Sequence, residues 1–222
     1  MNLTIVAATG GIGRHLLTQA LAMGHNVTAV VRRPAALPAA PARVVTADLG
    51  VPDESALRDA VTGADAVLSG LGPRTRADAA VAARGTRAMV AAMRSAGVRR
   101  IVVVSAAPVG TVPSPRRPHP PRHDPGDGPF MRYVLSPLVR AVFREHYADL
   151  ARMEDALRDS DLDWTVVRPP RLTNKPLTGR YRTAYGRNVP RGLTVSRADV
   201  AACMLRALDR PESIGQTVGV AA

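Results

Sequence analysis

The chain has 222 residues, a single cysteine and a formal net charge of +12. This length suits one sizeable core, and no flexible linker divides the chain, so we expect one domain over residues 1–222. Cys203 has no partner for an intramolecular disulfide, and the apolar run before Gly10 is too short for a secretory signal or a membrane span. We therefore expect a cytoplasmic protein without membrane contact.

The positive charge raises the hypothesis of a nucleic-acid partner, because clustered cations displace counterions from a phosphate backbone. Lys175 is the only lysine, so arginines supply the other 29 of the 30 basic residues, a skew more typical of codon bias than of a selected basic surface. Aromatic residues make up only 3% of the chain and offer few platforms for base stacking. We expect no nucleic-acid partner.

The first thirty residues predict a strand, a turn, a helix and a second strand. The apolar run 3–7 ends in a glycine-rich turn, and residues 11–23 follow a helical pattern that Gly24 can terminate. Residues 26–31 are rich in valine, which is typical of a buried parallel strand. Together these elements form a βαβ unit.

The same alternation continues along the chain. Further strands are predicted at 43–46, 66–69, 100–104, 164–168 and 217–220, and helices at 53–61, 77–96, 131–159 and 196–208. Ser196 and Asp199 form a capping box for the last of these helices. Strands separated by helices predict an α/β fold, a doubly wound and mainly parallel Rossmann-type sheet with helices on both faces.

A proline-rich insertion at about 108–129 interrupts this pattern. Its many prolines lack the amide donors and backbone angles of a helix, so the segment is predicted to be a loop. Ligands of doubly wound sheets bind beyond the carboxyl ends of the strands, and this loop follows the fifth strand. Either it forms a lid over a ligand, or it is a disordered surface loop.

The glycine turn carries the clearest functional signal, in the residues Thr9, Gly10, Gly11, Ile12 and Gly13. Glycines at such a turn permit a tight reversal and close approach of a pyrophosphate, which the helix amides then bind. The alternative is a tight turn without a ligand. The glycine turn follows a strand and precedes a helix, and this context favours dinucleotide binding over a ligand-free turn.

Arg32 and Arg33 indicate which dinucleotide is bound. NAD-specific sheets place a carboxylate at the end of the second strand to bind the ribose 2′-hydroxyl, and here two arginines occupy that place. Guanidinium groups bind a 2′-phosphate through charge-assisted hydrogen bonds. We predict NADP(H) as the cofactor, the alternative being two solvated arginines at a strand end.

Several segments together resemble the atypical short-chain dehydrogenase/reductases of the NAD(P)H-binding family, which includes flavin/biliverdin reductase-like and NmrA-like proteins. The matching segments are 8–13, 31–34, 47–49, 104–105, 153–154, 164–170 and 198–201. The resemblance implies adenine contacts from Asp48 and Leu49, and a nicotinamide site facing Ser105 and Pro170 to Leu172. It also implies that Gly70, Leu71 and Gly72 line the cofactor. Ala7 departs from the family, which usually has glycine there, and we expect the turn to survive with slightly tighter packing.

The chain lacks the Tyr-x-x-x-Lys pair that typical short-chain dehydrogenases use for catalysis. The nearest imitation is Tyr147, with Ala151 at the lysine position. Without a neighbouring cation, Tyr147 stays protonated near neutral pH, given a reference pKa of about 10. It can donate a hydrogen bond but is a poor base, so reduction is the favoured direction. Ser105 is a candidate to orient the acceptor, with His146 or Arg171 to polarise it.

Three functions remain open. The first is an NADPH-dependent reductase of a flavin, quinone or similar conjugated small molecule, because hydride transfer between stacked rings depends mainly on positioning. The second is a non-catalytic, NmrA-like sensor of the NADP redox state, and the third is an NADP-dependent epimerase or isomerase. No metal is expected, since His119 and His123 lie in the proline-rich loop without ligand spacing. A monomer or homodimer is expected.

Overall fold

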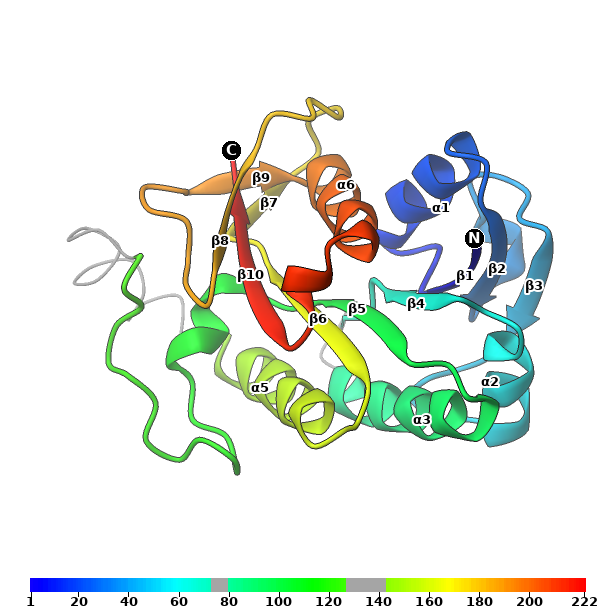
Figure 1. Cartoon of the computed structure of the whole chain (residues 1–222), viewed down its shortest axis with the longest axis horizontal. Helices are drawn as coiled ribbons and strands as arrows, with labels where there is room; N and C mark the ends of the chain where they lie inside the picture. The colour runs from blue at the N-terminus through cyan, green and yellow to red at the C-terminus, as the bar shows by residue number, and fades with distance from the viewer. Residues whose placement is uncertain (73–79, 127–142) are drawn as a thin grey trace.

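The computed structural model describes residues 1–72, 80–126 and 143–222, and a large twisted sheet runs through its middle (Figure 1). The sheet has eight strands in the order β3-β2-β1-β4-β5-β6-β10-β8. All neighbours are parallel except β8, which runs antiparallel to β10. The strands are β1 (Asn2–Val6), β2 (Asn26–Val31), β3 (Arg43–Thr46), β4 (Ala66–Ser69), β5 (Arg100–Val104), β6 (Asp163–Arg168), β8 (Arg182–Tyr185) and β10 (Gln216–Ala221). The predicted doubly wound Rossmann sheet is confirmed.

Helices cover both faces of this sheet. One face is covered by α1 (Gly13–Ala22) and α6 (Arg197–Arg206), and the other by α2 (Glu54–Val61), α3 (Val81–Ala96) and α5 (Arg144–Arg158) (Figure 1). A separate cluster of buried apolar side chains lies on each face. No helix in the part of the chain that the structure describes has the length and apolar character needed to cross a bilayer.

Side-chain caps fix where three of the helices begin. Asp53 accepts hydrogen bonds from the first amides of α2, and Ser196 accepts one of 2.9 Å from the Asp199 amide of α6, as the capping box predicts. The start of α3 has no cap of its own. Instead, the Asp149 carboxylate of α5 accepts from the amides of Ala82 and Ala83 at 3.0 and 3.1 Å. This contact joins α3 to α5.

The segment after β6 contains strands that the sequence did not predict. β7 (Arg171–Thr173) and β9 (Thr194–Ser196) pair in parallel as a separate two-stranded sheet, and β8 between them joins the edge of the main sheet. These strands have three or four residues each, with prolines and glycines between them. Such short runs carry too little periodicity to predict a strand.

The proline-rich loop is hydrogen-bonded to its surroundings over its described residues, 108–126. After a short 3₁₀ turn (Ala107–Thr111), Ser114 and Arg116 donate to the Asp155 carboxylate of α5. Near its other end, Asp124 accepts from the Asn188 amide at 2.8 Å. A role as a lid stays a prediction, and the predicted starts of the helices at 77 and 131 lie outside the described residues.

Candidate functional site

Glycine is required at two positions where β1 meets α1 and where β4 ends. A Cβ on Gly13 would lie 2.0 Å from the Ala7 carbonyl oxygen, and one on Gly70 would lie 3.0 Å from the Gly13 nitrogen. No side chain caps the start of α1, and its first turn has no acidic residue. The Arg14 and His15 amides already donate to the Gly10 and Ile12 carbonyls, so an anion beside the turn would meet the earlier amides, those of residues 11–13, and the positive dipole end of α1.

Ala7 itself has a φ of +58°, in the left-handed region that favours glycine. Its carbonyl oxygen accepts a 2.7 Å hydrogen bond from the Gly10 amide, which closes the turn. The turn forms with alanine at position 7, as expected, and the alanine bears a cost in backbone conformation.

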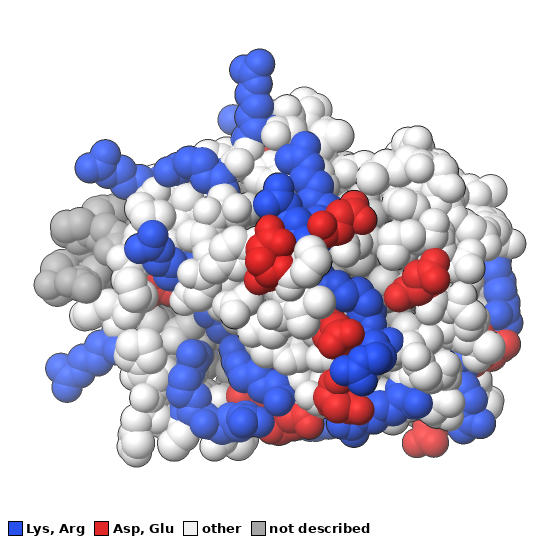
Figure 2. All heavy atoms as spheres, in the orientation of Figure 1, with Lys and Arg blue, Asp and Glu red and all other residues white. Residues whose placement is uncertain are grey.

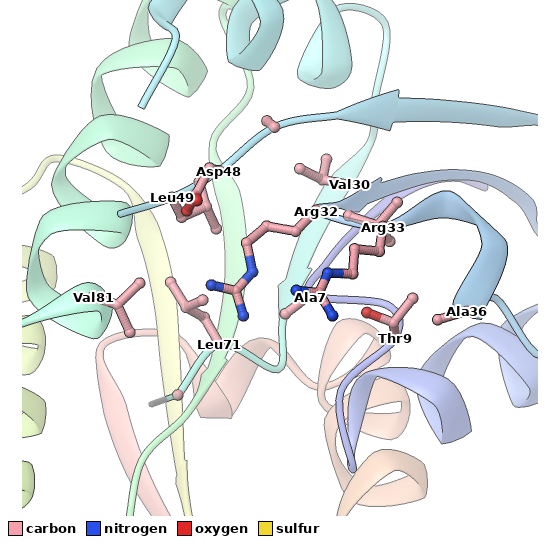
Figure 3. Close-up of a pocket in the computed structure, with 13 residues that line it drawn as sticks. Ala7, Thr9, Val30, Arg32, Arg33, Ala36, Asp48, Leu49, Leu71 and Val81 are labelled. Carbon is pink, nitrogen blue, oxygen red and sulfur yellow. The ribbon is translucent and has the colours of Figure 1, made fainter. Parts of the chain in front are cut away.

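A cavity of about 160 Å³ lies beside the turn, between the carboxyl ends of β2, β3 and β4 (Figure 3). Arg32 and Arg33 extend into it from the end of β2, while Asp48 and Leu49 border it from the end of β3. The residues that line it are Ala7, Thr9, Val30, Val31, Arg32, Arg33, Ala36, Ala47, Asp48, Leu49, Leu71, Gly72 and Val81. The cavity therefore brings together the predicted adenosine-side residues.

The predicted nicotinamide-side residues follow β5 and β6. Ser105 comes directly after β5, and its amide donates to the Val167 carbonyl of β6 at 2.8 Å. Pro170 follows β6, Leu172 is half-buried in β7, and Arg171 is exposed. These residues occupy the same carboxyl edge of the sheet as the glycine turn, although none of them lines the cavity.

A buried charge cluster holds the Ser105 side chain. Its hydroxyl donates to the carboxylate of Glu154, which also accepts hydrogen bonds from Arg168 and Arg158. Burial alone would raise the pKa of Glu154, but the two arginines and the Ser105 hydroxyl outweigh it, so this pKa lies below its ordinary value. Glu154 is therefore an anion, and the Ser105 proton points toward it.

Tyr147 and His146 lie side by side in the first turn of α5, with ring centroids 5.4 Å apart. Burial raises the pKa of Tyr147, and burial lowers the pKa of His146 against a smaller opposing effect of Asp149. Near neutral pH, Tyr147 is a protonated phenol and His146 an uncharged imidazole. Tyr147 packs in the core cluster on this face of the sheet, with only 9% of its surface exposed.

Comparison with known proteins agrees with this geometry. Residues 7–211 match the family described as NAD(P)H-binding. The chain belongs to the NAD(P)H-binding family. It is also 31% identical over 218 residues to the uncharacterized sugar epimerase YhfK of Bacillus subtilis, covering 94% of this chain and 88% of that protein.

Two solved structures share this fold over their whole length or nearly so. The anaerobilin reductase ChuY of Escherichia coli O157:H7 is 22% identical with a TM-score of 0.75, covering 100% of this chain and 97% of that one. SP1627 of Streptococcus pneumoniae, a candidate NADH-flavin reductase, is 24% identical with a TM-score of 0.72, covering 100% and 99%. At these identities the likeness shows a shared fold.

The sequence did not single out Arg197, which lies against the turn of this NAD(P)H-binding protein. A Cβ on Gly11 would lie only 2.9 Å from Arg197 Nε. Arg197 also donates to the Asn174 side chain at 2.6 Å. Both Arg197 and Arg14 lower the pKa of His15 on α1, after the larger effect of burial. Positive charge is thus concentrated at the start of α1.

Proposed function

We propose that this protein is an NADPH-dependent reductase that transfers hydride to a flavin, a quinone or a similar conjugated small molecule. The observation that carries the cofactor choice is the cavity beside the glycine turn, into which Arg32 and Arg33 extend. Two guanidinium groups provide the charge and the donors for a ribose 2′-phosphate. A carboxylate at the end of β2 would repel that group.

The residues present fit a bound dinucleotide. Gly13 and Gly70 allow the turn to approach β4 closely, and the first amides of α1 are free of a side-chain cap. In our proposal the amides of residues 11–13 bind the pyrophosphate, and Asp48 and Leu49 contact the adenine. NADPH supplies a hydride when bound.

The chain's own residues then orient the reactants. Because the Ser105 proton is directed to Glu154, the Ser105 oxygen presents lone pairs to a donor at the carboxyl edge of the sheet. This arrangement suits the amide group of a nicotinamide. Tyr147, His146 and Arg171 remain candidates to contact the acceptor, with Tyr147 as a hydrogen-bond donor. Flavin reduction needs no further acid, because solvent can supply the proton.

An epimerase is the second candidate, and the likeness to YhfK favours it. Epimerisation by transient oxidation requires a base that removes a proton from a sugar hydroxyl. The raised pKa of Tyr147 makes it unsuited to that role near neutral pH. Lys175 is the only lysine in the chain and lies between β7 and β8, not four residues after Tyr147 on α5. Reduction is therefore the better-supported reaction.

NADPH consumption, followed by nicotinamide absorbance with a panel of flavins and quinones, tests the proposal. We expect turnover with at least one acceptor and a preference for NADPH over NADH. Tight NADPH binding without turnover of any acceptor would favour the NmrA-like sensor. Interconversion of sugar epimers with no net loss of NADPH would favour the epimerase.

A further inference from the structure

One segment whose ends border the proposed site is strongly basic. Residues 169–198, which we call the basic segment, contain seven basic side chains and no aspartate or glutamate. They therefore carry +7 of the net +12 in 30 of 222 residues. The basic side chains are Arg171, Lys175, Arg180, Arg182, Arg187, Arg191 and Arg197. Residues 79–123 also lack carboxylates and carry +8 over 45 residues, so the position of residues 169–198 beside the proposed site is what distinguishes them.

The fold places both ends of the basic segment beside the proposed site. At its start, the Pro169 carbonyl accepts a 2.9 Å hydrogen bond from Ala107, two residues after Ser105. At its end, Arg197 lies against Gly11 of the glycine turn. Between them, β7 and β9 pair at the carboxyl edge of the main sheet. The segment thus spans the distance from the turn to Ser105.

Two carboxylates contact the backbone of this segment: Asp199 accepts from the Thr178 and Gly179 amides, and Asp124 accepts from the Asn188 amide. None of the seven side chains pairs with an aspartate or glutamate within the described residues. Six of them are exposed and Arg197 is half-buried. In Figure 2 the upper left of the molecule, where β8 and β9 lie in Figure 1, carries blue side chains and very little red. A small anion at this edge meets an attractive field.

We propose that the acceptor carries a phosphate or carboxylate group, which the basic segment attracts and binds. This inference rests on the proposed reductase and narrows its substrate class. Arginine binds both groups with charge-assisted hydrogen bonds, while the conjugated ring system stacks at the nicotinamide site. A neutral acceptor of the same shape gains the stacking but not the charge interaction.

Matched acceptors separate charge from shape. FMN and riboflavin share one ring and differ by a phosphate, and biliverdin and its dimethyl ester differ by two carboxylates. We expect the charged member of at least one pair to have a kcat/KM about tenfold higher at low salt, with the advantage shrinking near 1 M salt, where the Debye length is about 3 Å. An effect in the flavin pair indicates a phosphate on the acceptor, and an effect in the biliverdin pair indicates a carboxylate.

A charge-matched pair of variants assigns the effect to the basic segment. Lys175→Gln combined with Arg180→Gln removes two exposed cations from it, and we expect the charge preference to fall at least threefold. Arg58→Gln combined with Arg87→Gln removes two exposed cations from α2 and α3 and serves as the control. Equal losses in the two double variants would mean that net charge alone acts, which overturns the assignment.

Binding measurements keep this inference separate from the reaction. Dissociation constants for each pair are measured on the wild-type chain saturated with NADP⁺, without turnover. If the chain binds the charged member of a pair more tightly but oxidises no NADPH with it, the anionic ligand is supported and the proposed reductase activity is refuted. Turnover with equal affinities and equal kcat/KM within both pairs would refute the anionic acceptor and leave the reductase standing. If no member of either pair binds while an uncharged quinone is reduced, the anionic acceptor is refuted and the reductase stands.

Discussion

The Ser105 hydroxyl donates a 2.8 Å hydrogen bond to the carboxylate of Glu154, which is completely buried. The same carboxylate accepts from Arg168 on β6 and Arg158 on α5. One charge cluster therefore ties the end of β5 to α5 and sets the direction of the serine proton. A buried carboxylate with two guanidinium partners has a structural role as well as an orienting one.

Replacing Glu154 with glutamine should destabilise the fold strongly. The change leaves two guanidinium groups around an uncharged amide, and breaking a buried pair in this way costs about 3–5 kcal/mol. Urea unfolding measures the loss. Asp161→Asn, which breaks an exposed pair with Arg94, is the control and should change little. Equal stability of Glu154→Gln and wild type would contradict this account of the cluster.

The same residue predicts a pH dependence of stability. Because the folded pKa of Glu154 lies below its ordinary value of 4.5, its contribution is fully present above that value and is lost as the pH falls through the folded pKa. The difference in unfolding free energy between wild type and Glu154→Gln should be constant above about pH 6 and shrink under acid conditions. A difference that grows toward low pH would refute an ionised Glu154.

If Arg32 and Arg33 bind the ribose 2′-phosphate, removing them should reduce the preference for NADPH over NADH. Hydrogen bonds to a charged group contribute about 1.5–3 kcal/mol each, so removing both side chains with alanine should weaken NADPH binding at least tenfold. NADH lacks the 2′-phosphate and should lose no more than about threefold, which is below 1 kcal/mol. Calorimetric titration of each dinucleotide measures both losses. Equal losses would show that the two arginines do not distinguish the phosphate.

Ala7 offers a test of backbone strain in the turn. Its φ of +58° costs an alanine about 1–2 kcal/mol, and glycine adopts this conformation freely. Ala7→Gly should therefore raise the free energy of unfolding by about 1 kcal/mol, after the extra entropy of the unfolded glycine is subtracted. The adjacent buried Ala8 is the control, since Ala8→Gly should destabilise. A loss of stability in Ala7→Gly would refute the strain.

The sequence predicts the parts of the fold that local patterns determine. The strands at 26–31, 43–46, 66–69 and 100–104 have the predicted bounds, because apolar or β-branched residues make up most of each run and turns delimit it. Asp53 and Ser196 mark the starts of their helices for the same local reason. The glycine turn and the two arginines after β2 also lie close together in sequence.

The rest of the site depends on contacts between distant residues. Ser105 and Glu154 are separated by 49 positions, and Asp149 caps a helix that begins more than 60 positions earlier. No periodic pattern reports such contacts. In the sequence, the excess of arginine over lysine indicates codon bias and does not single out residues 169–198, whose two ends the fold places beside Ala107 and the glycine turn.

Arg197 is predicted to contribute to pyrophosphate binding. Within the described residues its hydrogen bond goes to the neutral Asn174 side chain, so its charge is available beside the start of α1. Arg197→Ala should weaken NADPH binding about tenfold, the loss expected for one charge-assisted hydrogen bond of about 1.5 kcal/mol. Adenosine 2′-monophosphate, which lacks the pyrophosphate, should bind unchanged. Arg206→Ala, at the other end of α6, is the control.

Gly11 provides an independent check on where the Arg197 side chain lies. A methyl group at position 11 would approach Arg197 Nε to 2.9 Å and displace the arginine from the turn. Gly11→Ala should therefore weaken NADPH binding in the wild-type background but have much less effect when Arg197 is already alanine. Such non-additivity is the signature of two residues in contact. Additive losses would place the guanidinium away from the phosphates and leave α1 alone to bind them.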